Sequence, residues 1–164
     1  VKCQEWHPDA TDNQTTPQES LNQAKKANDS AFLYLTQGNG SSVAGALSDF
    51  VSKYNDRNPG KEVLYFNYAA VDPVLTNDKC SFWHFRWEAN TDMRVNTLTD
   101  FIAGQKNVSK VHLINQDYAY GKEISRAARK MLATKLPDIK IVGDDLHPLG
   151  KVKDVSRYIA TAKA

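Results

Sequence analysis

AFLYLTQGNGSS, residues 31–42, is the stretch that decides the fold of this 164-residue chain. It begins with a continuous apolar run of strand length, which is typical of a strand buried on both faces of a parallel sheet. A glycine-rich turn, residues 38–42, follows at once, and apolar residues then recur at helical spacing from Val43 to Tyr54. Strand, turn and helix in this order predict the first unit of an α/β domain.

The same alternation of apolar strand and amphipathic helix continues to the end of the chain. Further strands are predicted at residues 1–6, 62–66, 82–87, 110–114 and 139–142, and further helices at 17–27, 91–103, 118–132 and 154–162. The first of these helices has a start signal, because Thr16 precedes Pro17 and Glu19 completes a capping box. Strands that alternate with helices predict an α/β fold with doubly wound parallel sheets.

The strand at 82–87 is unusually aromatic. Trp83, Phe85 and Trp87 alternate with His84 and Arg86, so the aromatic rings line one face of the strand. Core packing is the favoured interpretation of that face, ahead of a stacking platform for a ligand or for single-stranded nucleic acid.

Composition and charge exclude several classes of protein. Hydrophobic residues make up 41% of the chain and charged residues 24%, which is typical of a folded globular protein. A net charge of +2 without a basic run argues against nucleic acid as a partner. No apolar stretch approaches the roughly 20 residues that span a bilayer. Cys3 and Cys80 form one disulfide or stay as two thiols, and their spacing does not decide between these states.

No motif for catalysis or metal binding is visible in the sequence. The four histidines are scattered without metal-ligand spacing: His7, His84, His112 and His147. A Gly-x-Ser-x-Gly elbow, a Walker loop and a Gly-x-Gly-x-x-Gly fingerprint are all absent from the sequence. We therefore expect no catalytic residue, no metal and no cofactor.

The glycine-rich turn at 38–42 has the chemistry of an anion site. A turn from a strand into a helix leaves free backbone N–H groups at the positive end of the helix dipole. Ser41 and Ser42 add hydroxyl groups, and Gly40 lets a ligand approach the backbone closely. Such a nest suits a carboxylate, and the alternative is that Ser41 only caps the helix.

Three more stretches follow in a distinctive order. NYAAVDPVLT (residues 67–76) follows a strand, Phe85-Arg86 precedes a long helix, and VHLINQDYAYG (residues 111–121) joins a strand to a helix. Together with the turn at 38–42, they resemble the type I periplasmic binding proteins of the branched-chain amino acid and amide receptor family of ABC importers. The resemblance extends over essentially the whole chain.

That resemblance implies parts of two Rossmann-like lobes. Residues 1–106 would belong to the N-terminal lobe, without its first strand and helix, and residues 107–164 to an incomplete second lobe. The first strand lies centrally in such a sheet, so its absence would expose unpaired backbone and apolar surface. We therefore expect the sheet to be completed by the remainder of the same protein or by a second copy in a dimer.

The resemblance also implies a set of ligand-binding residues in three loops: Asn39, Gly40, Ser41, Ser42, Ala69, Ala70, Val71, Tyr118 and Tyr120. Val71 departs from the receptors that carry a hydroxyl at this position, so this chain lacks that donor. Tyr120 would cover the ligand from the second lobe, and Tyr118 would share this wall. The competing interpretations are an ordinary strand-end turn at residues 69–71 and structural packing of the two tyrosines.

The function that the resemblance implies is reversible capture of a solute, with no catalysis. The ligand would be an amino acid, an amide or a small carboxylate, aromatic carboxylates included. It would bind first to Gly40, Ser41, Ser42 and Ala70, and hinge closure would bring Tyr120 over it. The receptor would be periplasmic or otherwise extracytoplasmic and would deliver the ligand to an ABC permease. Alternatives are a ligand-sensing domain of a regulator or receptor and, more remotely, a doubly wound α/β enzyme.

Overall fold

The alternating α/β pattern is confirmed in the computed structural model, which describes residues 8–28, 32–37 and 39–163. The predicted strand at 1–6 and the Cys3 partner of a disulfide with Cys80 lie outside the described residues. In chain order the elements are α1 (Pro17–Asn28), β1 (Tyr34–Gln37), α2 (Ser41–Arg57), β2 (Leu64–Asn67), the 3₁₀ helix η1 (Pro73–Thr76), β3 (His84–Arg86), α3 (Thr91–Ala103), β4 (Lys110–Gln116), α4 (Ala119–Lys135), β5 (Lys140–His147) and α5 (Ser156–Lys163).

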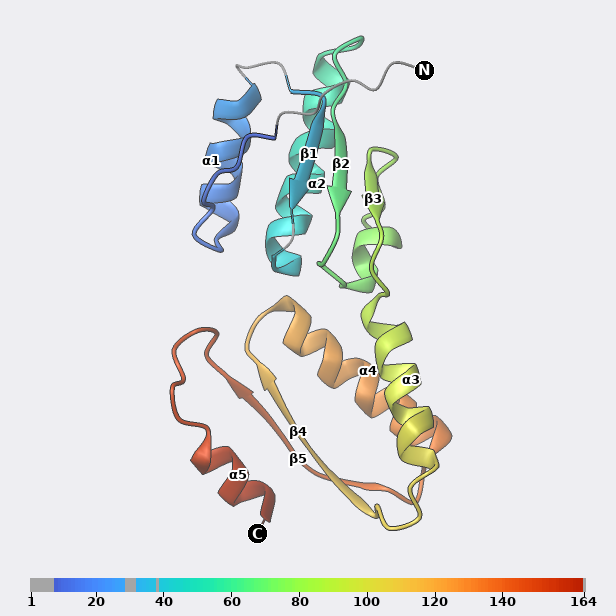
Figure 1. Cartoon of the computed structure of the whole chain (residues 1–164). Coiled ribbons are helices and arrows are strands. Elements are labelled where there is room, and N and C mark those ends of the chain that lie inside the picture. The colour runs from blue at the N-terminus through green and yellow to red at the C-terminus, as the bar shows by residue number, and fades with distance from the viewer. Residues whose placement is uncertain (1–7, 29–31, 38, 164) are drawn as a thin grey trace.

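Two parallel sheets organise these elements. The first sheet has three strands in the order β1-β2-β3, and the second pairs β4 with β5. Figure 1 shows the strand arrows of β1 and β2 pointing toward the second sheet, and those of β4 and β5 pointing back. The carboxyl ends of the two sheets therefore face each other, and loops that follow the strands meet between them.

The start of α1 forms only half of the predicted capping box. The Glu19 backbone N–H donates to Thr16 Oγ1 at 3.2 Å, as a helix cap requires. The Glu19 carboxylate instead accepts hydrogen bonds from the side chains of Asn22 (3.1 Å) and Gln23 (2.6 Å), one turn further along the helix. These two hydrogen bonds lower the pKa of Glu19, and the bond from Asn22 has the larger effect.

One face of the first sheet packs on α2 and forms the main core. Tyr65 of β2 is completely buried, and Val43, Leu47 and Val51 of α2 belong to the same cluster. At the far end of α2, the Asn55 side chain exchanges two 2.9 Å hydrogen bonds with the backbone N–H and carbonyl of Val63. These bonds tie the end of the helix to the start of β2.

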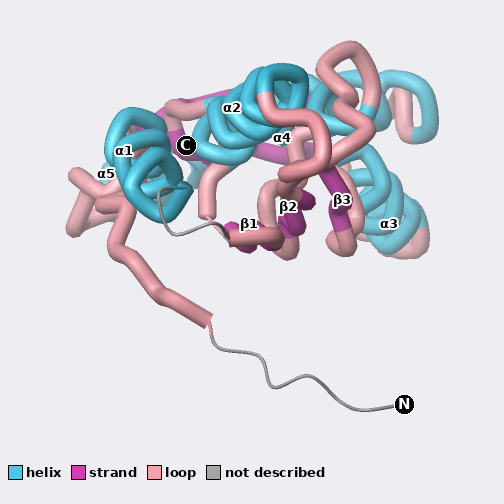
Figure 2. Tube along the Cα trace, turned by 90° about the horizontal axis from the view of Figure 1, so that it is seen from above, coloured by secondary structure: helices cyan, strands magenta, loops and turns pink. Residues whose placement is uncertain are grey.

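The opposite face of the first sheet is an exposed aromatic row. Phe66 lies at its centre, with ring centroids 6.0 Å from Tyr34, 5.8 Å from Phe85 and 5.4 Å from Trp87. Figure 2 shows α2 on one side of the strands and no described helix on the other.

Two predictions are therefore wrong. β1 is not buried on both faces, because Tyr34 is 49% exposed. Core packing of the aromatic face is wrong for two of its three residues: Phe85 is 42% and Trp87 73% exposed and His84 turns inward, whereas Trp83 packs against the α2 core. Alternation is observed for Phe85 and Trp87 but not for Trp83, which precedes β3, and no described helix covers the exposed face.

The second sheet is covered by helices on both faces. Asp144 of β5 contacts Ser125 and Arg129 of α4, whereas the ring of His147, three residues later, lies 5.7 Å from Tyr158 of α5. Residues an odd number apart in a strand point to opposite faces, so α4 and α5 lie on opposite sides, as a doubly wound sheet requires. No helix among the described residues is long and apolar enough to cross a membrane.

Helix α3 joins the two sheets and packs along α4 (Figure 1). Val95 of α3 shares a buried cluster with Ala127 and Ala128 of α4. Arg126 of α4 lies 2.8 Å from Asp92, near the start of α3. The division of the chain at residues 106 and 107 stays a prediction.

Leu47→Ala tests the α2 core. Leu47 is 3% exposed, so the truncation should leave a cavity and lower the free energy of unfolding by about 2–5 kcal/mol. Leu98→Ala is the control, since Leu98 is 55% exposed and its loss should change stability by less than about 0.5 kcal/mol. Urea titration of both variants measures this, and equal losses would contradict the assigned core.

Candidate functional site

A cavity of about 210 Å³ lies where loops from the facing ends of the two sheets meet. Seven of the nine predicted ligand-binding residues line it. After β1 come Gly40 and Ser41; after β2 come Ala69, Ala70 and Val71; after β4 come Tyr118 and Tyr120. The carboxyl ends of parallel strands are where α/β proteins commonly bind ligands. Arg94 of α3 completes the lining and was not predicted.

The two remaining predicted residues do not line this cavity. Asn39 exchanges side-chain hydrogen bonds with Asn13 at 3.1 and 3.2 Å and accepts another from Gln37 at 3.0 Å. It lies in a larger hollow of about 840 Å³ beside the outer edge of β1. Ser42 is exposed on α2. Asn39 and Ser42, on either side of Gly40 and Ser41, therefore lie outside the candidate site.

Gly40 and Ser41 set the entry into α2. Gly40 is the helix N-cap and has φ 59°, a left-handed conformation that favours glycine. Ser41 is the first helical residue, and its hydroxyl oxygen accepts from the Asp72 N–H at 3.3 Å. The interpretation of Ser41 as the helix cap is therefore wrong, because no side chain caps α2. Its hydroxyl hydrogen stays available as a donor.

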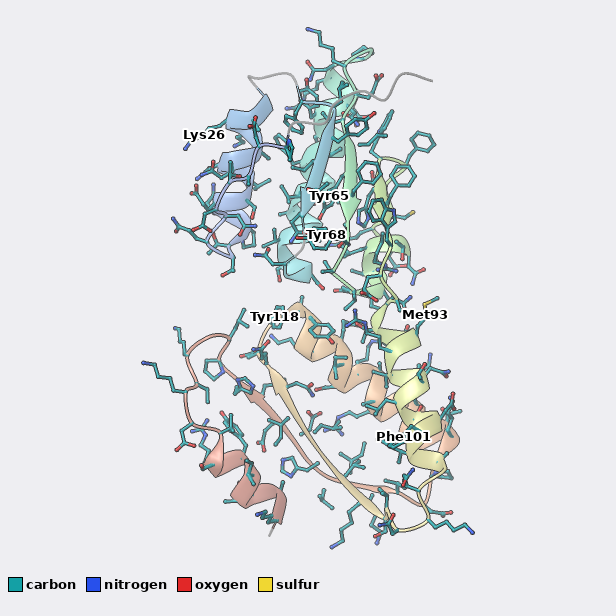
Figure 3. All side chains as sticks on the ribbon, in the orientation of Figure 1. Lys26, Tyr65, Tyr68, Met93, Phe101 and Tyr118 are labelled. Atoms are coloured by element: carbon teal, nitrogen blue, oxygen red, sulfur yellow. The ribbon has the colours of Figure 1, made fainter. Side chains whose placement is uncertain are left out.

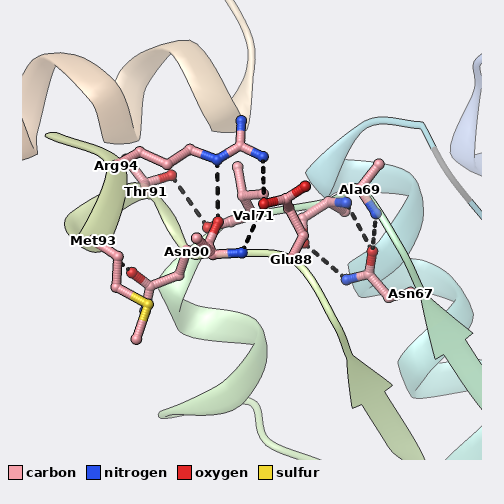
Figure 4. Close-up of polar contacts among 10 residues, drawn as sticks. Asn67, Ala69, Val71, Glu88, Asn90, Thr91, Met93 and Arg94 are labelled. Atoms are coloured by element: carbon pink, nitrogen blue, oxygen red, sulfur yellow. Dashed lines mark hydrogen bonds and ion pairs between the residues drawn. The ribbon is translucent and has the colours of Figure 1, made fainter. Parts of the chain in front are cut away.

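The loop after β2 is shaped by Asn67, whose side chain is completely buried. Its Oδ1 accepts from the backbone N–H groups of Ala69 (3.2 Å) and Ala70 (2.7 Å), and its Nδ2 donates to the Ala70 carbonyl at 2.8 Å. Nδ2 also lies 3.2 Å from His84 Nε2. Figure 4 shows the Asn67 bonds to the Ala69–Ala70 turn. One buried amide thus fixes the conformation of this wall.

Val71 is held from the other side by α3. Its carbonyl accepts from the Thr91 N–H at 2.9 Å and from Thr91 Oγ1 at 3.1 Å. Its own N–H has no hydrogen-bond partner among the described residues, although the Val71 side chain is buried. Val71 lines the cavity, so this backbone N–H is a donor at this wall that does not depend on a hydroxyl at this position.

Tyr118 and Tyr120 form the wall on the second sheet's side. Their ring centroids lie 6.0 Å apart in an edge-to-face arrangement, and Figure 3 shows Tyr118 at the end of α4 that faces the first sheet. Burial raises the pKa of Tyr118, so its hydroxyl stays protonated and can donate. The glycine that follows is required, because a Cβ at Gly121 would lie 1.8 Å from the Gln116 carbonyl oxygen.

Arg94 lies against the segment that joins β3 to α3. Its Nε donates to the Ala89 carbonyl at 3.1 Å, and its Nη2 lies 3.1 Å from Glu88 Oε1. In Figure 4 the third guanidinium nitrogen carries no dashed line and lies on the side of α4. A cation near the N-terminus of a helix interacts unfavourably with the helix dipole. This unfavourable position is the one signal in the sequence that could have indicated a functional role for Arg94.

Parallel α/β sheets whose carboxyl ends face one another across a cavity define the class of the type I periplasmic binding proteins, and solved structures of that class share the fold. The sequence profile described as "Periplasmic binding protein" matches residues 9–164. The chain therefore belongs to the periplasmic binding protein family, as the resemblance in its loops predicted.

The names of several similar proteins mention an amino acid or a carboxylate as the ligand. Leu/Ile/Val-binding protein homolog 4 of Brucella abortus is 34% identical over 154 residues, which cover 93% of this chain and 36% of the relative. The closed structure of a leucine-, isoleucine-, valine-, threonine- and alanine-binding protein from Brucella ovis is 32% identical, with TM-score 0.73 over 90% of this chain and 38% of that one. A solute-binding protein from R. palustris in complex with benzoate shares the fold, with TM-score 0.75 and 17% identity over 92% of this chain and 39% of that one. The chain thus spans little more than a third of their length.

His84 makes the Asn67 network sensitive to pH. Its Nδ1 lies 3.3 Å from the Leu75 carbonyl, to which it can only donate, so Nε2 must accept from Asn67. A nitrogen that accepts carries no proton, so the contact of Nε2 with Asn67 requires neutral imidazole, and burial lowers the pKa of His84.

Below pH 6.5, the ordinary His pKa, the unfolded chain takes up a proton that folded His84 resists. The stability that neutral His84 contributes is therefore complete above that pH and is lost as the pH falls toward the lowered folded pKa. We expect urea midpoints at about pH 7.5 and about pH 5 to differ more for the wild type than for His84→Gln. Equal differences in the two proteins would show that His84 plays no part.

Proposed function

We propose that these residues form part of the solute-binding receptor of an ABC importer. The observation that supports this is the convergence of three strand-end loops, from two separate sheets, on one cavity. A ligand held there would touch both sheets at once. Binding would then favour the arrangement in which they lie close together, which is the physical basis of ligand-driven closure.

The first sheet offers a rigid binding surface. The N–H groups of Ser41 and Val71 and the Ser41 hydroxyl are fixed by α2, by the Asn67 network and by Thr91. A carboxylate bound by such fixed donors pays little reorganisation. Tyr118 and Tyr120 would then cover the ligand from the second sheet with apolar ring area and hydroxyl groups.

The ligand class follows from these donors and from the relatives. Fixed N–H and hydroxyl donors suit an amino acid, an amide or a small carboxylate, and the names of the Brucella and R. palustris proteins fall within that range. We propose an extracytoplasmic receptor that passes its ligand to a membrane permease. The relatives are longer than this chain. The residues that bind the far end of the ligand would belong to the region that corresponds to their remaining length.

Two neighbouring serines provide the test. Isothermal titration of the complete polypeptide with a panel of L-amino acids, their amides and aromatic carboxylates should find at least one ligand. Ser41→Ala should weaken its binding roughly tenfold, because a hydroxyl on the cavity wall is lost.

Ser42→Ala is the matched control, since it removes an exposed hydroxyl one residue away. Its affinity should stay within about twofold of the wild type. Absence of binding to the whole panel would refute the receptor function. Equal effects of the two substitutions would be compatible with the receptor function but would show that the ligand does not bind at Ser41.

A further inference from the structure

Charge is unevenly distributed around the cavity. Among the described residues that line it, Arg94 is the one that carries a charge; the others are small, aliphatic or tyrosine residues. The first N–H groups of α2, at Ser41, add a partial positive charge at the same cavity. The part of the site that this chain builds is therefore electropositive.

Arg94 is held in place but retains free donors. A guanidinium group has five N–H donors, and its Nε and Nη2 are engaged by the Ala89 carbonyl and by Glu88. Nη1 has no partner among the described residues, and Figure 4 shows it on the side of α4. Contacts that fix one edge of a guanidinium lower the entropy lost when the other edge binds a ligand.

The negative charge of Glu88 does not remove the attraction of Arg94 for an anionic ligand. The Ala89 N–H, at 2.8 Å, and then Arg94 lower the pKa of Glu88, so it stays ionised. Glu88 does not line the cavity, however, and its carboxylate is 39% exposed to solvent, which screens it. Glu88 is therefore a positioning residue for Arg94.

We propose that Arg94 determines specificity by binding a carboxylate of the solute, so that the receptor takes free acids and rejects their amides. This proposal rests on the proposed function and narrows it, because it excludes amides from the proposed ligands. A free amino acid and a simple aromatic acid both remain possible ligands, because both carry the carboxylate that Arg94 would bind. An amide in the same place would keep one acceptor, its carbonyl oxygen, but would lose the second acceptor and the negative charge that a carboxylate offers to the guanidinium.

Matched acid and amide pairs test this in the complete polypeptide. The probes are L-leucine with L-leucinamide and benzoate with benzamide, each titrated calorimetrically. The wild type should bind at least one acid more than about tenfold more tightly than its amide. Arg94→Gln should lower that acid-to-amide ratio about tenfold, and Arg94→Lys should restore part of it by returning the charge.

Arg129→Gln is the matched control, because Arg129 of α4 pairs with Asp144 of β5 and lies outside the cavity lining. It should leave the ratio unchanged. Thermal unfolding of each variant confirms that it is folded, and the ratio within one variant is independent of its stability. Amides that bind as tightly as acids, or a ratio that survives Arg94→Gln, would overturn this proposal while leaving the receptor function intact. Wild-type protein that binds none of the four probes, and nothing in the wider panel, would refute both.

Discussion

The buried amide of Asn67 is the interaction on which the candidate site depends. A completely buried side chain with one acceptor and two N–H donors must satisfy them all inside the protein. Asn67 does so by bonding the N–H groups of Ala69 and Ala70, the Ala70 carbonyl and His84. The strand-end loop therefore has one conformation that satisfies these groups, and the cavity wall is formed before any ligand arrives.

The second wall is attached to the first through α3. This helix starts at the edge of the first sheet, where Asn90 caps it by accepting from the Met93 N–H at 2.9 Å. It then packs on α4 through Val95 and through the Asp92–Arg126 ion pair. Exposed ion pairs of this kind contribute little stability on their own, so the apolar contact carries most of the attachment. Because Thr91, at the start of α3, also bonds to the Val71 carbonyl, this helix contacts the loops of the first sheet as well as α4.

Local patterns in the sequence predicted the positions of helices and strands well, but they did not predict which other elements pack against them. The helix at 91–103 was predicted at its observed bounds, because its apolar spacing is regular. β5 was predicted too short, because its second half, Gly143 to His147, is polar: Asp144 and Asp145 bond to Arg129 and His112 within the fold. The exposed aromatic row was mispredicted for a related reason, since coverage of a face depends on elements distant in sequence.

The same distinction explains why seven of the predicted residues line the cavity although Arg94, which also lines it, was not predicted. The family resemblance of the loops pointed to Ser41, Ala70 and Tyr120, and these residues line one cavity because loops after parallel strands converge at one edge of a sheet. Arg94 reaches the cavity with a long side chain whose direction is set by Glu88 and Ala89, and no spacing in the sequence records that direction. Its partners lie in the segment between β3 and α3. The group that carries charge into the cavity is thus held by the segment that follows the edge strand of the first sheet.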